Sequence, residues 1–241
     1  MQDYLQITNH ALLFGNSTIS DEDTRSSRIA STEALSKVCP HMLFQAQVLE
    51  MPMTTAVRDQ DAELDYMQLN NRANQLARHL RDLGLKPGDP VGVLPDFSSD
   101  MGLILLGVLK AGGYMVARSP NAPFRWDLSQ DAVIVLGGAC QAQGEEIRKR
   151  AICLDRDWHD IAEQPGANLA VPVEPYHPAC RGASGNLISH GLLAHRAMER
   201  IGSLGLTRRA LVSVDAQMGL DELLGHCLTA WLCGATVAMV S

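Results

Sequence analysis

Residues 64–118 have the sequence LDYMQLNNRANQLARHLRDLGLKPGDPVGVLPDFSSDMGLILLGVLKAGGYMVAR, and this stretch decides the fold class. Its first part repeats apolar residues at spacings of four, three, four and three, which places them on one side of a helix. The apolar stripe consists of Leu69, Ala73, Leu76, Leu80 and Leu83. Asp65 can cap this helix together with Gln68, and Gly84 can end it in a left-handed turn.

The second half of the stretch predicts a buried strand, a buried helix and another strand. Residues 86–89, Lys-Pro-Gly-Asp, are typical of a turn, and residues 91–94, Val-Gly-Val-Leu, predict a short buried strand after it. Residues 101–110 are apolar on nearly every side, which indicates a helix in the interior rather than on the surface. Two glycines end it before the strand expected at 114–117. Elements of this order and length predict a crossover in a parallel sheet.

Four separated motifs in this region resemble the opening of an adenylate-forming enzyme. They are residues 64–70, 72–74, 83–93 and 108–114, in the order in which the family has them. The likeness is greatest to the adenylation domains of nonribosomal peptide synthetases, is good from about His41 to Arg125, and continues loosely to the end of the chain. The resemblance implies ATP-dependent activation of an amino acid as the family chemistry.

The rest of the chain continues the alternation of strands and helices. We expect strands at 132–136, 152–154, 210–214 and 236–240, and helices at 143–150, 189–201 and 220–233. This order predicts an α/β fold with mostly parallel sheets and helices on their faces. Residues 39–241 are therefore expected to form a partial, truncated adenylation-like domain. Residues 1–38 are expected to form a polar extension or linker, because residues 17–32 offer little to bury.

Composition and charge favour an ordinary globular protein. The chain has 46% hydrophobic and 20% charged residues, and its net charge of −7 argues against a nucleic-acid surface. No apolar run follows a basic amino terminus, so we expect no signal peptide. The apolar stretch 223–240 is interrupted by Gly234, which favours a helix and a strand over a membrane span. The cysteines show no metal or disulfide spacing, which predicts reduced thiols in a cytoplasmic protein.

The position that corresponds to the family's phosphate-binding loop is residues 181–186, Arg-Gly-Ala-Ser-Gly-Asn. In the family this loop is rich in Ser, Thr and Gly and ends in a lysine, and its N–H groups and hydroxyls face the phosphates. Gly182, Ser184, Gly185 and Asn186 keep part of the pattern, but the threonines and the lysine-bearing segment are missing. Loss of one preorganised donor costs about 3–4 kcal/mol in catalysis, so the resemblance implies an impaired loop. An ordinary turn before a helix is the alternative.

Asp215 matches the aspartate with which the family holds the α-amino group of its substrate. The family has an aromatic residue before this aspartate, whereas Val214 stands here. Without the resemblance, Asp215 is a polar residue at the carboxyl end of a strand, where α/β proteins place ligands but also start ordinary loops. Both interpretations stay open.

The remaining family machinery lies past the position that corresponds to Ser241. The adenine pocket, the ribose and magnesium ligands and the catalytic lysine of the lid all belong to that part of the family. The resemblance therefore implies that this chain alone does not complete adenylation. We expect no catalytic residue, no metal site and no cofactor, with ATP and Mg²⁺ as the ligands of any nucleotide site that survives.

Other residue groups suggest weaker hypotheses. Residues 182–185 almost match a hydrolase nucleophile elbow, but the second glycine comes one position early. Residues 155–160 contain three aspartates and a histidine that could bind a cation or could be a solvated loop end. Glu222 and His226 share a helix face, but two groups do not make a metal site. His190 and His195 are expected to be surface or capping residues.

Two functions from different classes remain. The first is a catalytically impaired adenylation-like protein that serves as an interaction or structural module in nonribosomal peptide biosynthesis. Its expected partners are a peptide synthetase, a carrier protein or a second copy of itself, in a homodimer. The alternative is half of a split amino-acid-adenylating ligase that a second polypeptide completes. Neither nucleic acid nor membrane is expected as a partner.

Overall fold

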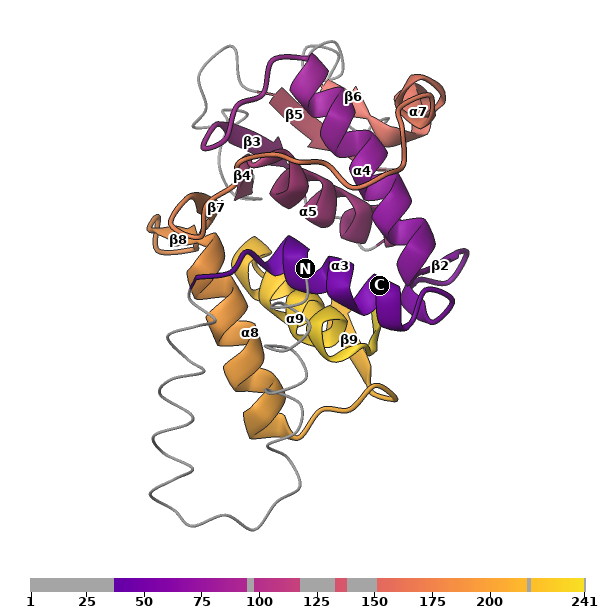
Figure 1. The fold of residues 1–241 in the computed structure, drawn as a ribbon, viewed down its shortest axis with the longest axis vertical. Coiled ribbons are helices and arrows are strands. Elements are labelled where there is room, and N and C mark those ends of the chain that lie inside the picture. Colours follow the sequence, from indigo (N-terminus) through magenta and orange to yellow (C-terminus); the bar gives the residue numbers. More distant parts are fainter. Residues whose placement is uncertain (1–36, 95–97, 118–132, 138–150, 216–217, 241) are drawn as a thin grey trace.

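Two sheets with helices packed against them make up the described part of the chain (Figure 1). The structure, a computed structural model, describes residues 37–94, 98–117, 133–137, 151–215 and 218–240. The four-stranded sheet has the order β2-β1-β10-β9, and the six-stranded sheet has the order β6-β5-β3-β4-β7-β8. Neighbouring strands are parallel except where β2 and β8 pair antiparallel at the sheet edges. The predicted α/β class with mostly parallel sheets is thereby confirmed.

The strands are short and the helices longer. The strands are β1 (Thr55–Arg58), β2 (Glu63–Asp65), β3 (Pro90–Val93), β4 (Tyr114–Ala117), β5 (Val133–Leu136), β6 (Ala151–Cys153), β7 (Pro178–Arg181), β8 (Leu187–Ser189), β9 (Leu211–Asp215) and β10 (Thr236–Val240). The helices are α3 (Pro40–Glu50), α4 (Tyr66–Asp82), α5 (Ser99–Ala111), α7 (Leu154–Ala162), α8 (His190–Leu204) and α9 (Leu220–Cys233). In Figure 1, α3 lies between α4 and α5 on one side and α8 and α9 on the other.

Helix α4 has the capping predicted for it. The Asp65 carboxylate accepts the Gln68 N–H at 2.7 Å, and the Gln68 side chain accepts the Asp65 N–H at 3.0 Å. Gly84 has the left-handed φ of +95° that ends the helix. The stripe is buried from Leu69 to Leu80, but Leu83 is 55% exposed because the helix ends before it.

Helix α5 is buried along nearly its whole length, as its composition predicts. Every residue from Met101 to Ala111 is buried, and Gly112 ends the helix with φ +86°. β3 and β4 on either side of it pair in parallel, with Val91 opposite Met115. The strand–helix–strand unit that the sequence predicts is therefore present.

Three aromatic side chains join α3, α4 and α9 in the core. Phe44 stacks on Tyr66 at 5.3 Å between ring centroids and meets Trp231 edge-on at 5.7 Å. The Tyr66 hydroxyl donates to the Ala235 carbonyl at 2.8 Å, and the Trp231 indole N–H donates to the Ala56 carbonyl at 3.0 Å. The polar atoms of these two rings thus have partners, as stable cores require.

The segment between α7 and β7 lies along the outer face of α4. Gln75 donates to the Ala162 carbonyl at 2.9 Å, and Arg78 donates to the carbonyls of Pro165 and Ala167 at 3.0 and 2.8 Å. The Gln75 bond joins α4 to the last residue of α7, and the two Arg78 bonds tie the irregular segment after α7 to α4.

Several sequence expectations need correction. The sequence did not indicate the strands β1, β2, β7 and β8 or the helix α3. Leu154 begins α7 instead of ending a strand, and the helix expected at 143–150 lies outside the described residues, as does the extension at 1–36. The stretch 223–240 does divide at Gly234 into α9 and β10. No described helix is both long enough and apolar enough to cross a membrane.

Candidate functional site

The predicted phosphate loop is the turn of a β-hairpin between β7 and β8. The Gly182 N–H donates to the Asn186 carbonyl, and the Gly185 N–H donates to the Gly182 carbonyl, both at 2.9 Å. Gly185 adopts a φ of +84°, which other residues rarely adopt. Ser184 and Asn186 are exposed at the tip. Two backbone donors that a phosphate would need are therefore used within the turn.

A carboxylate lies beside this turn. Asp221, in the first turn of α9, accepts the Ala183 N–H at 3.4 Å through its Oδ2 atom. The same oxygen would lie 3.2 Å from a Cβ at Gly182. Burial, and then the charge of Asp221, raises the pKa of the nearby Cys180 thiol to about 12. The turn therefore faces a negative group where the family's loop faces a negative ligand, and such like charges repel.

Lysine is absent from the whole second part of the chain, since residues 151–241 contain none. The family loop ends in a lysine that contacts the phosphates. The turn therefore lacks the family's lysine, and the N–H groups of Gly182 and Gly185 are already bonded within it.

Asp215 lies at the carboxyl end of β9, as predicted. It is exposed, stands opposite Val240 of β10 in the register, and its carbonyl accepts the Met218 N–H at 3.2 Å. α9 begins at Leu220, and its residue Asp221 contacts the hairpin turn. The two predicted site positions are thus both next to the start of α9.

The acidic residues at 155–160 lie on α7 and not at a loop end, which corrects that expectation. The Asp157 carboxylate accepts the Cys153 N–H at 2.9 Å and two N–H groups of the Arg156 guanidinium at 2.6 Å. The bond to Arg156, ahead of the bond to Cys153, lowers the pKa of Asp157. Its oxygens are therefore already occupied by protein donors.

The other weak hypotheses find little support in the geometry. Ser184 lies in a hairpin turn, whereas a nucleophile elbow requires a strand-to-helix turn. The His226 ring Nδ1 lies 2.9 Å from the Glu222 carbonyl, a contact within one helix.

His190 is buried, so its expected place at the surface is wrong. It is the first residue of α8 and is 0% exposed, while the neighbouring Ser189 provides the helix cap by accepting the Leu192 N–H at 3.2 Å. His195 is partly buried and lies 3.4 Å from Glu199. Sequence spacing did not indicate that His190 approaches Cys39 and His41, which form with it a cluster of metal-ligand type.

The cysteines mostly follow the expectation of reduced thiols. Cys39, Cys180, Cys227 and Cys233 are free and buried. Cys153 is disulfide-bonded, so the expectation is wrong for that residue.

Known proteins resemble this chain over much of its length. The AMP-binding enzyme family matches residues 44–134. One linear gramicidin synthase protein of Brevibacillus parabrevis is 40% identical over 141 residues, which are 55% of this chain and 3% of that protein. Bacitracin synthase 1 of Bacillus licheniformis is 48% identical over 83 residues, covering 34% of this chain and 2% of that protein. The chain thus spans a small part of these relatives.

Solved structures share the fold at low sequence identity. The nonribosomal peptide synthetase FmoA3 aligns with a TM-score of 0.72 and 22% identity over 84% of this chain and 22% of that one. VinN in complex with 3-methylaspartate aligns with a TM-score of 0.71 and 18% identity over 84% of this chain and 62% of that one. The resemblance to the adenylate-forming superfamily is thereby confirmed, with residues 44–134 matching its AMP-binding family and 84% of the chain sharing the fold of a part of a nonribosomal peptide synthetase.

Proposed function

We propose that this chain is a catalytically impaired adenylation-like module that acts in nonribosomal peptide biosynthesis by binding another protein. The family match and the similarity to gramicidin and bacitracin synthases support the biosynthetic setting. The partners we propose are a peptide synthetase, a carrier protein or a second copy of this chain.

The contact between Asp221 and the hairpin turn carries this proposal. The Asp221 carboxylate lies against Ala183 and Gly182, at the position where the family binds the phosphates of ATP. A triphosphate placed there would meet the negative charge of Asp221 and a turn whose glycine N–H groups are already bonded. Positioned donors and cations supply most of the stabilisation in phosphoryl and acyl transfer, so their loss predicts little activity.

Exposed apolar side chains on the four-stranded sheet favour an interaction role. β9 lies at the edge of that sheet among the described strands, and Leu211 at its start is 50% exposed. Val240, at the end of the neighbouring β10, is 41% exposed. Exposed sheet edges with apolar side chains tend to pair with another chain.

Calorimetric titration with ATP, with and without Mg²⁺, tests the loss of nucleotide binding. We expect no binding tighter than about 1 mM, which corresponds to roughly 4 kcal/mol. The ATP affinity of Asp221→Asn, which removes the charge at the turn, is compared with that of the wild type. Glu222→Gln is the matched control because it removes a charge from the same helix turn at an exposed position. Amino-acid-dependent exchange of pyrophosphate into ATP by the chain alone would overturn the proposal.

A split amino-acid-adenylating ligase is the second candidate. The position of Asp215 at a strand end, where the family binds a substrate amino group, favours it. This candidate requires a second polypeptide that supplies the nucleotide-binding groups. It predicts pyrophosphate exchange only in the mixture, with loss of exchange in Asp215→Asn. A mixture without exchange would remove it.

A further inference from the structure

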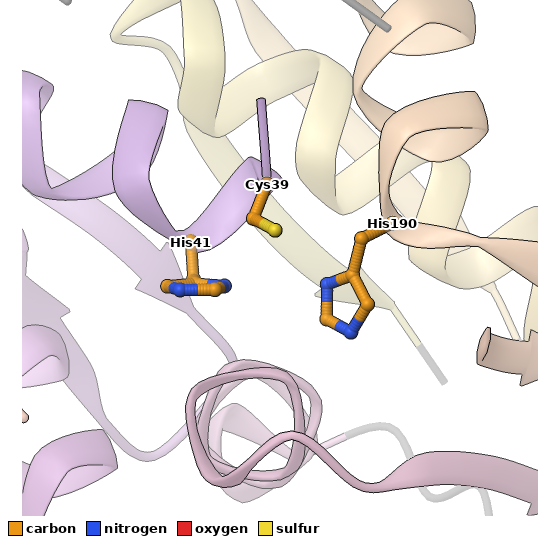
Figure 2. A group of neighbouring side chains, drawn as sticks. All are labelled: Cys39, His41 and His190. Atoms are coloured by element: carbon orange, nitrogen blue, oxygen red, sulfur yellow. The ribbon is translucent and has the colours of Figure 1, made fainter. Parts of the chain in front are cut away.

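Three side chains of metal-ligand type meet in the interior between α3 and α8. Cys39 precedes the first residue of α3, His41 is its second residue, and His190 is the first residue of α8. Their ligand atoms all lie within 4.8 Å of one another, and the two imidazole rings meet edge to face at 5.8 Å between centroids. Figure 2 shows the Cys39 sulfur between the two rings. The side chains are buried, at 1%, 8% and 0% exposure for Cys39, His41 and His190.

Three of the four ring nitrogens of this cluster lack hydrogen-bond partners among the described residues. Both nitrogens of His190 and Nδ1 of His41 are buried without a partner. A buried polar atom without a partner costs about 1–3 kcal/mol, and native structures contain few of them. A neutral imidazole has one donor and one acceptor, so two rings and a thiol leave acceptors that a cation can use.

We propose that Cys39, His41 and His190 bind one Zn²⁺ ion. Zinc prefers thiolate sulfur and imidazole nitrogen, in tetrahedral sites with Zn–S near 2.3 Å and Zn–N near 2.0–2.1 Å. Such a site requires ligand atoms roughly 3.3–3.6 Å apart. The ligand atoms lie up to 4.8 Å from one another, so they would move closer by up to roughly 1.5 Å when the ion binds.

A fourth ligand is available from the backbone. The Val173 carbonyl oxygen lies 3.4 Å from the Cys39 sulfur, close to the separation of two ligands on one tetrahedral ion. Val173 belongs to the segment between α7 and β7, so the ion would join that segment to α3 and α8.

The protonation states suit coordination by the histidines. Burial lowers the pKa of His190 to about 3, with a smaller contribution from His177, and burial lowers the pKa of His41 with contributions from His190 and Lys110. Both rings are therefore neutral near pH 7, as metal ligands must be. Burial, followed by Glu174, raises the pKa of the Cys39 thiol to about 12, so the ion must displace this proton. Coordination does deprotonate thiols.

The charges around the cluster are mixed. Glu174 and the Cys39 thiolate are negative, whereas Lys110 lies near His41 and opposes a cation when protonated. Burial, followed by the charge of Arg78, lowers the pKa of Lys110 to about 7.

A surface hollow lies beside residues that neighbour the ligands in the chain. It has a volume of about 550 Å³ and is lined by residues next to the ligands, including Glu174 and Ser189. Ser189 directly precedes His190, and Glu174 directly follows Val173.

Cobalt substitution tests this site directly. Chelator-treated full-length protein is titrated with Co²⁺ and then with Zn²⁺. We expect one Co²⁺ per chain with a thiolate-to-cobalt absorption band in the near ultraviolet, and loss of that band when Zn²⁺ displaces Co²⁺. The absence of a thiolate band, or the binding of more than one Co²⁺ ion per chain, would overturn the proposal.

Single substitutions locate the ion. Cys39→Ala and His190→Gln should each weaken Zn²⁺ binding at least 100-fold in competition with a chromophoric chelator. Cys227→Ala is the matched control, because Cys227 is also a free and fully buried cysteine but is not part of the cluster. Binding that survives Cys39→Ala, or that is lost in Cys227→Ala while the fold persists by circular dichroism, overturns the assignment. The cobalt band of the wild-type protein tests whether the chain binds the ion through a thiolate. The proposal therefore remains testable even if one of the variants fails to fold.

Discussion

The amine of Lys110 is one of the few charged groups in the interior. It is 2% exposed and donates to the Asn70 side-chain oxygen at 2.8 Å. Asn70 in turn donates to Asn168 at 3.0 Å, and Asn74 donates to Asn168 at 3.0 Å and to the Gly166 carbonyl at 2.7 Å. The lysine therefore links the buried α5 to the polar contacts that hold the segment beside α4.

Stability near neutral pH should depend on this one amine. Burial lowers the pKa of Lys110 from 10.5 to about 7, so between these values the unfolded chain binds more protons than the folded one. The free energy of unfolding therefore rises with pH, by up to about 1.4 kcal/mol per pH unit. We expect this rise from pH 7 to about 8.5, above which the buried cysteines act in the opposite sense.

Denaturant titrations of Lys110→Met at several pH values check this expectation. The variant should lose the rise, whereas Lys86→Met, at a position outside the buried core, should keep it. An unchanged slope in Lys110→Met would show that the amine is not the titrating group.

At the scale of the element, the capping of α4 can be measured alone. Asp65→Ala removes the acceptor of the Gln68 N–H and should lower the free energy of unfolding by about 1 kcal/mol. Asp65→Asn keeps a capping oxygen and should cost much less. Equal losses in the two variants would indicate that charge, rather than capping, is responsible.

The contact between α4 and α5 leaves no space for a methyl group at Gly107. A Cβ there would meet Leu76 Cδ2 at 2.8 Å, so Gly107→Ala should destabilise the protein by about 1–2 kcal/mol even though alanine favours helices. Gly202→Ala on α8 is the matched control, because nothing lies within 4 Å of its added Cβ. It should stabilise by about 0.5–1 kcal/mol. Thermal denaturation that ranks the two variants in the other order would contradict the close packing.

The elements that the sequence predicted are those whose signal is local. The capping pair at Asp65 and Gln68, the glycine ends and the all-apolar α5 depend on neighbours within a few residues. Strands of three or four residues, such as β2 and β8, are too short to show the alternation of apolar and polar residues that identifies a strand in a sequence. The contact of Asp221 with the turn, and that of His190 with Cys39, join residues far apart in the chain and become visible only after folding.

At the scale of the whole molecule, the exposed strand β9 predicts association. We expect a homodimer, or a stable complex with a peptide synthetase or carrier protein, in sedimentation velocity. Leu211→Glu should weaken that complex, whereas Leu204→Glu, at an exposed site at the end of α8, should not. A monomer that binds none of these partners would count against the interaction role.

The bond from Gln75 to the last residue of α7, and those from Arg78 to the segment after α7, have a consequence for which residues α4 tolerates. A helical wheel marks both positions as outward-facing, and outward-facing positions ordinarily accept almost any polar residue. Here both long side chains donate to backbone carbonyls outside α4, so a shorter residue at either position would lose those hydrogen bonds. Saturation mutagenesis should therefore find that few substitutions are tolerated at these two positions on the outer side of α4. Their surface location alone would predict that most polar residues are tolerated there.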